Sequence, residues 1–184
     1  MKILLVLALL FTSNLLFAKS CLKYNTTSTP TVVSWTAFKT PLKIGVGGRF
    51  NKVVVTTKSK TGSLSKILTG AKFNIDSKSV DTSNSSRDLK IVSTFFKDIS
   101  ISGSITKVKK GRIFLTLTMN GQTVDVTLSY TFKDKKLNAV GTLDIFDFKM
   151  ISHLEALHNA CKDLHENKTW NDVGLALSIE FESC

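Results

Sequence analysis

The sequence is short of acidic residues. Its 184 residues include 14 Asp and Glu against 25 Lys and Arg, which gives a formal net charge of +11. The basic residues are scattered along the chain and form no run with interleaved aromatic side chains, so no nucleic-acid partner is expected. A surplus of lysine instead suits a soluble β-protein with guarded sheet edges, or peripheral contact with an anionic membrane surface.

Catalytic signatures are also missing. No Gly-x-Ser-x-Gly nucleophile motif occurs in the chain. The glycine cluster Gly45–Gly48 resembles a phosphate-binding loop at first, but no helix pattern follows it and no Lys-Ser or Lys-Thr pair closes the motif. We therefore expect that the protein is not an enzyme and has no cofactor.

Long apolar runs are absent except at the N-terminus, where Lys2 precedes an apolar stretch that continues to Ala18. This pattern predicts a secretory signal peptide over residues 1–18, with a retained membrane anchor or a lipid-modified cysteine as weaker alternatives. Residues 19–184 then suit a single domain with a proper core, since the sequence shows no linker and no repeat.

Cysteine is scarce as well. In an exported protein, the three cysteines Cys21, Cys161 and Cys184 permit one disulfide and leave one thiol. Two pairings are open. Cys21 reaches Cys184 if the first strand lies beside the last, as in a closed antiparallel barrel, whereas Cys21 paired with Cys161 would pin a late helix.

The strongest local signal that is present is a β-hairpin over residues 111–132. Apolar residues alternate with mostly polar ones on both sides of Asn120-Gly121, a dipeptide typical of two-residue hairpin turns. Each strand has one apolar face that must be covered. A sheet closed on itself around an apolar interior would cover it.

The same alternation recurs along the chain and predicts an all-β antiparallel barrel of about eight strands with two short helices. Glycines 45, 47 and 48 are expected to allow a bend or bulge. The expected strands lie within residues 31–38, 50–57, 71–75, 99–105, 113–119, 124–132, 137–145 and 173–181, and the expected helices are 85–95 and 150–164.

Three stretches resemble the YceI-like family of exported lipid-binding proteins. Residues 35–39, Trp-Thr-Ala-Phe-Lys, are similar to that family's first strand, and residues 46–50, Val-Gly-Gly-Arg-Phe, to the turn that follows it. Residues 79–89, Ser-Val-Asp-Thr-Ser-Asn-Ser-Ser-Arg-Asp-Leu, with Phe-Phe at 95–96, are similar to its most specific signature. The family's usual Asp-x-x-His-Ser is replaced by Asn-Thr-Thr-Ser at 25–28.

The resemblance implies a lipocalin-like, eight-stranded antiparallel barrel in the periplasm that binds a lipid in its bore without catalysis. The ligand would be an isoprenoid, an isoprenoid quinone or a fatty-acid-like chain. Two alternatives stay open: a structural or stress-related periplasmic barrel with a filled interior, and a metal-linked or haem-linked redox accessory protein. A homodimer is also open.

Candidate ligand contacts come from the strand faces assigned inward. An inward apolar stripe is more often a filled core than the wall of a ligand site, and here the two interpretations differ only in the volume of the bore. Arg87 is a further candidate, facing an acidic headgroup at the barrel mouth, whereas the alternative is that the Arg87-Asp88 pair caps a helix and forms a structural salt bridge. The inward candidates are Val33, Trp35, Phe50, Phe73, Val126, Leu128, Tyr130, Leu177 and Phe181.

A possible metal site is formed by His158, Cys161 and His165, which lie at i, i+3 and i+7 and would share one helix face. Three ligands on one helix cannot surround a metal without a further group. Cys161 also falls among leucines on the apolar stripe, so a packed or disulfide-bonded cysteine is the favoured interpretation.

Overall fold

The structure is a computed structural model that describes residues 21–25 and 31–184. The predicted signal peptide and residues 26–28 of the Asn-Thr-Thr-Ser stretch lie outside the described residues. Among the described residues, no helix is both long enough and apolar enough to cross a membrane.

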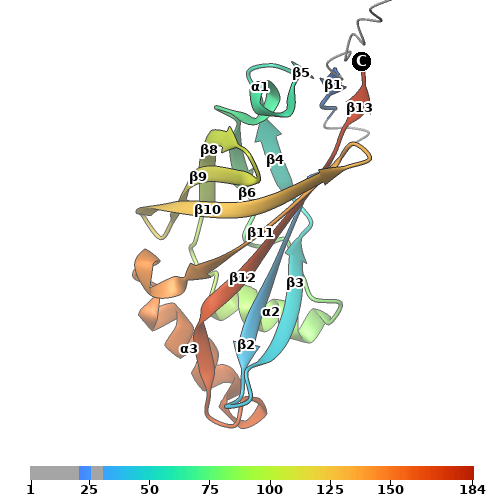
Figure 1. Cartoon of the computed structure of the whole chain (residues 1–184). Helices are drawn as coiled ribbons and strands as arrows, with labels where there is room; N and C mark the ends of the chain where they lie inside the picture. Colours follow the sequence, from blue (N-terminus) through green and yellow to red (C-terminus); the bar gives the residue numbers. More distant parts are fainter. Residues whose placement is uncertain (1–20, 26–30) are drawn as a thin grey trace, which may run out of the picture.

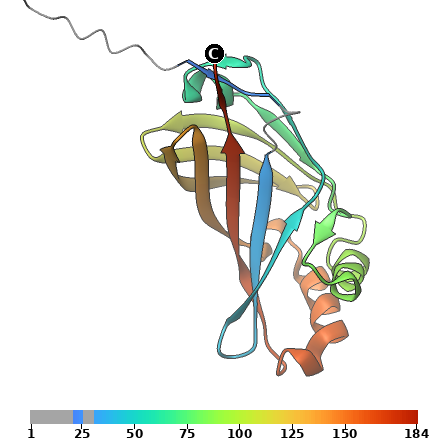
Figure 2. The same cartoon turned by 90° about the vertical axis from the view of Figure 1, so that its right-hand side faces the viewer.

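One ten-stranded antiparallel sheet forms most of the molecule, in the order β4-β6-β8-β9-β10-β11-β12-β2-β3-β7. It curls strongly into a half-barrel whose edges are β4 and β7 (Figures 1 and 2). The predicted all-β class is therefore confirmed. The strands are β2 (Val32–Lys39), β3 (Ile44–Phe50), β4 (Val53–Thr56), β6 (Lys72–Ile75), β7 (Val80–Asp81), β8 (Ile101–Lys109), β9 (Arg112–Met119), β10 (Gln122–Lys133), β11 (Lys136–Asp144) and β12 (Thr169–Glu180).

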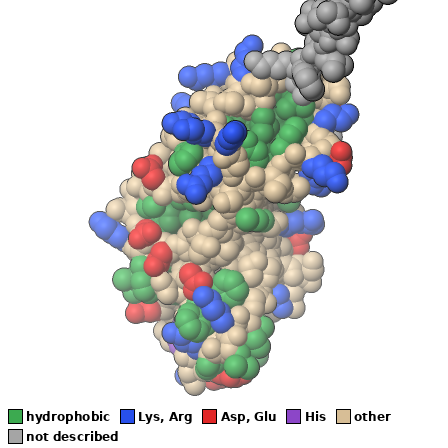
Figure 3. Space-filling model, viewed as in Figure 1, with side chains coloured by type: hydrophobic (Ala, Val, Ile, Leu, Met, Phe, Trp, Pro, Cys, Tyr) green, Lys and Arg blue, Asp and Glu red, His purple; other side chains and the backbone are tan. Residues whose placement is uncertain are grey.

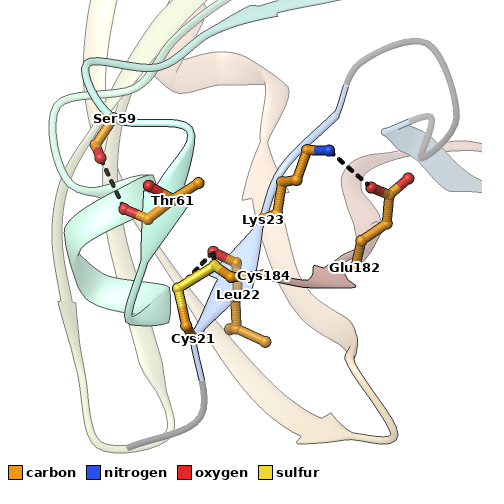
Figure 4. Close-up of a disulfide and its surroundings, with 7 residues drawn as sticks. All are labelled: Cys21, Leu22, Lys23, Ser59, Thr61, Glu182 and Cys184. Atoms are coloured by element: carbon orange, nitrogen blue, oxygen red, sulfur yellow. Dashed lines mark hydrogen bonds and ion pairs between the residues drawn. A yellow bond between two sulfur atoms is a disulfide. The ribbon is translucent and has the colours of Figure 1, made fainter.

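A second, three-stranded sheet ties the two ends of the described chain together. It consists of β1 (Leu22–Lys23) between β13 (Glu182–Ser183) and β5 (Thr61–Gly62). Beside it, Cys21 and Cys184 form a disulfide with their Cα atoms 5.4 Å apart (Figure 4). The structure thus selects the first of the two pairings, although the joined ends form a separate small sheet and do not close the barrel.

Short helices connect and cover the strands. They are α1 (Leu64–Leu68), α2 (Ser85–Thr94), α3 (Ile151–Cys161) and the 3-10 turns η1 (Ile145–Phe148) and η2 (Lys162–Leu164). Both expected helices are confirmed, with the second divided into α3 and η2. In Figure 2, α2 (green) and α3 (orange) lie together beside the lower end of the sheet, away from the C-terminus.

The predicted hairpin is confirmed as β9 and β10, with Met119 opposite Gln122. Asn120 and Gly121 have φ values of 50° and 70°, so both central residues of the turn are left-handed, as a type I′ turn requires. The Asn120 side chain donates hydrogen bonds to the carbonyl oxygens of Phe148 at 3.0 Å and Lys149 at 3.2 Å. The turn is thereby fastened to η1.

The prediction for the glycine cluster was wrong. Gly45, Gly47 and Gly48 lie within the regular strand β3, and none of them has a positive φ. The chain bends instead at Asn51, between β3 and β4. At Gly48 the missing side chain makes room for a neighbouring ring, as described below.

Packing changes along the half-barrel. Near the small sheet, Leu137 and Ile179 face each other across β11 and β12 and are 0% and 2% exposed. Further along β12, Leu177 and Val173 alternate onto the same inner face but are only half-buried. The interior is therefore closely packed around Leu137 and hollow beside Leu177 and Val173.

Candidate ligand-binding cavity

The hollow part of the interior is a cavity of about 590 Å³. Its walls are the inner face of the half-barrel together with α2, α3 and Leu68 of α1. A volume of this size is typical of ligand pockets, and a mostly apolar wall favours an apolar ligand.

Seven of the ten predicted ligand contacts lie on the cavity wall. That they contact a ligand stays a prediction, but the structure brings them together around one space. They are Val33, Trp35, Phe50, Phe73, Arg87, Leu128 and Leu177.

Three predicted contacts, Val126, Tyr130 and Phe181, lie away from the wall. Phe181 follows the end of β12 and packs against Tyr24 and Phe132, with ring centroids 6.0 Å apart in both pairs. Val126 is 6% exposed within the packed core, and Tyr130 is half-buried on β10. A period of two tells which face of a strand a residue occupies, but not how far along the barrel the interior is filled.

The sequence did not predict that the helices form part of the cavity wall. The cavity is lined by Ile91 of α2, by Phe95 at the C-cap of that helix, and by Leu154, Leu157 and Cys161 of α3. The apolar spacing of α3 was visible in the sequence as the pattern 154, 157, 161. What this apolar face covers could not be predicted, because an apolar helical stripe can pack on a solid core or border a cavity equally well.

Two strand glycines let large rings lie flat against the wall. A Cβ atom built on Gly48 would come within 2.4 Å of Cζ2 of Trp35, and one on Gly103 within 2.4 Å of Cζ of Phe73. Each glycine pairs with the aromatic residue across the sheet. The rings therefore occupy the space of absent side chains, which leaves the lumen open.

The predicted Arg87-Asp88 pair has two separate roles. Asn84 caps α2 by accepting a hydrogen bond from the backbone N–H of Arg87 at 2.9 Å. Asp88 accepts hydrogen bonds from the backbone N–H of Thr82 at 2.9 Å and from its hydroxyl at 2.6 Å. The capping interpretation is thus confirmed. The salt-bridge interpretation is wrong: no described carboxylate forms an ion pair with Arg87, which borders the cavity.

The two histidines of the proposed metal site meet at a hydroxyl group. Nδ1 of His158 and Nδ1 of His165 lie 3.1 Å and 3.0 Å from Oγ1 of Thr169. Cys161 is a free, half-buried thiol on the cavity wall. Within 21–25 and 31–184, no three His, Cys, Asp or Glu side chains are grouped so as to hold a metal ion.

His165 is in a basic environment. Burial of the imidazole lowers its pKa, and the positive charges of Lys39, His158 and Lys90 lower it further. The lysines elsewhere on the molecule are spread out. On the face shown in Figure 3, blue side chains are scattered among red and green ones without forming a continuous stripe.

The fold and the cavity define a class of protein: an antiparallel half-barrel that encloses an apolar, ligand-sized space. Within that class, the chain belongs to the YceI-like family, because the model of the YceI-like domain matches residues 24–181. No curated protein matches the chain.

Several solved structures share the fold. A polyisoprenoid binding domain from Saccharophagus degradans, implicated in plant cell wall breakdown, is 13% identical and has a TM-score of 0.61, with 90% of this chain and 99% of that chain covered. BcnA of Burkholderia cenocepacia is 16% identical, with a TM-score of 0.55 and coverage of 81% and 94%. The YceI protein of Campylobacter jejuni is 18% identical, with a TM-score of 0.53 and coverage of 76% and 85%. At these identities the likeness establishes the fold alone.

Proposed function

We propose that this protein is an exported, periplasmic binding protein that holds one long-chain apolar lipid in its cavity, without catalysing a reaction. The chain would be an isoprenoid, an isoprenoid quinone or a fatty-acid-like lipid. The observation that carries the proposal is the apolar cavity of about 590 Å³. Membership of the YceI-like family and the polyisoprenoid binding domain among the similar structures support it.

The cavity volume suggests a ligand size. If each non-hydrogen atom of the chain occupies about the volume of one liquid water, ~30 Å³, then 590 Å³ holds roughly twenty such atoms. Burial of apolar surface at about 25 cal/mol per Å² would hold a chain of that length with micromolar affinity or better, with few polar contacts.

A hollow interior favours this function over a purely structural barrel. A filled barrel would bury the inner face of β12 along its whole length. Val173 and Leu177 are half-buried on that same face because they border the cavity.

The first experiment is organic extraction of freshly purified protein followed by mass spectrometry. A co-purified long-chain lipid at near-equimolar amount is expected. Because an exported protein can lose its ligand during purification, the second experiment measures the affinity for geranylgeraniol, an alcohol with a twenty-carbon prenyl chain, by titration calorimetry.

Two tryptophan substitutions make the second experiment specific. Leu177→Trp puts an indole into the cavity and is expected to weaken geranylgeraniol binding at least tenfold. Val140→Trp is the matched control, because Val140 is 59% exposed on the neighbouring strand and lies outside the cavity. Equal affinities for the two variants, or no binding by the unmodified protein, would contradict the proposal.

A further inference from the structure

Two turns that lie side by side form the end of the molecule opposite the C-terminus (Figures 1 and 2). Residues 39–44 join β2 to β3, and residues 162–170 run from η2 into β12. The backbone N–H of Thr40 donates a hydrogen bond to the carbonyl oxygen of Lys168 at 3.1 Å, and the indole N–H of Trp170 donates one to the carbonyl oxygen of Thr40 at 2.8 Å. These bonds fasten the two turns together, and we call them the tip.

The tip exposes large aliphatic side chains. Leu42 is 83% exposed, more than any other large apolar side chain of the described residues. Leu164 in the second turn is 67% exposed, and Ile44 at the start of β3 is 48% exposed. Single exposed leucines are common on protein surfaces, but several in two joined turns indicate a surface that contacts something apolar.

The backbone of both turns is fixed by hydrogen bonds. In the first turn, Thr40 and Lys43 have φ values of 62° and 56°, and the N–H of Lys43 donates to the carbonyl oxygen of Thr40 at 3.0 Å. In the second turn, the N–H of Asn167 donates to the carbonyl oxygen of Lys162 at 3.2 Å. Leu42 is therefore held outward by its turn and does not fold back onto the protein.

The surroundings of these side chains are basic. The tip contains four lysines and two carboxylates, and its lysines are Lys39, Lys43, Lys162 and Lys168. Lys43 forms an ion pair with Asp172 at 2.7 Å, but no described carboxylate lies within ion-pair distance of the other three lysines. The lower end of Figure 3 shows green and blue side chains together, with red ones among them. Exposed aliphatic side chains with unpaired lysines are complementary to an anionic membrane surface.

We propose that the tip docks the protein onto an anionic phospholipid bilayer. Leu42, Ile44 and Leu164 enter the boundary between headgroups and acyl chains, and the lysines remain at the level of the phosphates. The half-buried ring of Trp170 lies between Lys43 and Lys168, whose amino groups are 4.9 Å and 4.5 Å from its centre, and indoles favour the membrane interface.

The size of the tip favours a bilayer over a protein partner. Its two turns contain ten exposed residues, whereas a specific protein interface usually involves about 20–30 residues on each side. Two protruding turns present little flat surface to a second protein. A bilayer accepts such turns, because its headgroup region closes around each inserted side chain.

Docking would have a consequence for the cavity. Leu164 and Trp170 belong to the tip and also line the cavity, and Leu164 is largely exposed, so the cavity reaches the surface at the tip. A docked protein would therefore exchange an apolar chain with the bilayer without exposing that chain to water. This consequence rests on the proposed function, whereas the docking itself does not.

The test measures binding of the full mature protein to large unilamellar vesicles by co-sedimentation at fixed ionic strength. One vesicle type is pure phosphatidylcholine, and in the other about one lipid in four is phosphatidylglycerol. Partitioning onto the anionic vesicles is expected to be at least about tenfold stronger. In Leu42→Ser/Ile44→Thr it should fall by at least about tenfold. Neither residue lines the cavity, so the affinity for geranylgeraniol in solution should stay within about twofold.

The control for exposed apolar surface is Val54→Thr/Val140→Thr. Val54 on β4 and Val140 on β11 are 62% and 59% exposed and lie outside the tip, and threonine keeps the branched shape that suits a strand. Vesicle binding by this variant should stay within about twofold of the unmodified protein. Thermal unfolding checks that each variant is folded.

A second pair of variants separates docking through the tip from diffuse attraction by the net charge. Lys162→Gln/Lys168→Gln removes two charges from the tip, and Lys109→Gln/Lys110→Gln removes two exposed charges from the turn between β8 and β9. The tip variant should lose at least about tenfold in binding to anionic vesicles, and the other variant less than about threefold. Equal losses in the two variants would overturn the docking site.

The remaining outcomes are equally decisive. Vesicle binding that survives Leu42→Ser/Ile44→Thr would overturn the proposal, and loss of self-association by that variant in sedimentation velocity would then assign the tip to a second copy of the chain. If the unmodified protein binds anionic vesicles but not geranylgeraniol, the carrier function fails and the docking surface stands. If it binds geranylgeraniol but no vesicles, the docking inference fails and the carrier function stands.

Discussion

Gly48 determines how the ring of Trp35 lies on the cavity wall. A Cβ atom at position 48 would overlap the ring at 2.4 Å, so Gly48→Ala should tilt the indole into the lumen. We expect a loss of about 1–3 kcal/mol of stability from overpacking and weaker binding of geranylgeraniol. Chemical unfolding and calorimetry measure the two effects.

Gly47 provides the control in the same strand. A Cβ atom at position 47 would meet only the backbone oxygen of Trp35, at 3.9 Å, so Gly47→Ala should bind the alcohol as the unmodified protein does. If the two alanine variants lose affinity equally, then the effect belongs to strand β3 as a whole and not to the contact between Gly48 and Trp35.

His165 should make the stability depend on pH. Burial, together with Lys39, His158 and Lys90, lowers its pKa below the ordinary value of 6.5, so the unfolded chain binds this proton at a higher pH than the folded protein does. Stability that is fully present above about pH 6.5 should therefore decrease as the pH falls toward the lower pKa of the folded state.

The measurement is the free energy of unfolding in urea at several pH values between 7.5 and 5, at constant ionic strength and without ligand. In His165→Gln the decrease should be smaller than in the unmodified protein. Lys39→Gln, which removes one source of the repulsion, should have an intermediate effect. An identical pH dependence in the unmodified protein and His165→Gln would show that this imidazole is not responsible.

At the scale of elements, Asn120 joins the β9–β10 hairpin to η1 through two hydrogen bonds. Asn120→Gly keeps a residue that tolerates the left-handed φ of 50° but loses both bonds, so we expect a loss of roughly 1–3 kcal/mol. The free energy of unfolding measures it.

Asp134 tests whether the loss comes from the hydrogen bonds or from glycine itself. It has the same φ of 50° in the turn between β10 and β11 and is exposed. Asp134→Gly should change the stability by less than the Asn120 variant does. A similar loss in both would mean that turn entropy, and not the attachment to η1, explains the effect.

The elements that the sequence predicted correctly are those with local signals. The Asn120-Gly121 turn, the period of two around it and the helical spacing of 151–161 each depend on neighbours within one turn or one strand pair. The prediction of a bend at the glycine cluster was wrong because Gly48 makes room for the ring of Trp35 across the sheet. Sequence neighbours alone do not reveal that contact, so they could suggest only a bend. Val126, Tyr130 and Phe181 lie off the cavity wall for a similar reason, since how far the interior is filled is a property of the whole barrel.

The same limit holds for the basic residues that line the cavity, Lys39, Arg87, Lys90 and His165. Arg87 was predicted to face an acidic headgroup at the barrel mouth. Lys39, Lys90 and His165 come from three different elements, and nothing in their spacing connects them. They meet only because β2 pairs with β12 and α2 packs near α3.

At the scale of the whole molecule, the disulfide fastens the small three-stranded sheet, which lies outside the cavity lining. Cys21 and Cys184 are 163 positions apart, so the bond closes almost the entire described chain into a loop. Cross-linking a loop of that length restricts the unfolded state strongly, by an amount on the order of 4–5 kcal/mol in the chain-entropy model. Figure 4 shows the bond beside the strand pair that carries the Lys23–Glu182 ion pair.

The double substitution Cys21→Ser/Cys184→Ser should therefore lower the free energy of unfolding by several kcal/mol while the folded protein still binds geranylgeraniol. Binding should persist because neither cysteine, nor any residue of the three-stranded sheet, lines the cavity. Urea unfolding and calorimetry at a temperature where the variant is folded give the two quantities.

Cys161→Ser is the matched control, because it removes the free thiol and leaves the disulfide. It should keep the stability within about 1 kcal/mol, since Cys161 is only half-buried. If the double variant lost its ligand affinity together with its stability, the two ends would be energetically coupled. The packed residues Leu137 and Phe181, which lie outside the cavity lining, would then transmit the constraint of the disulfide to the cavity rather than separate the two.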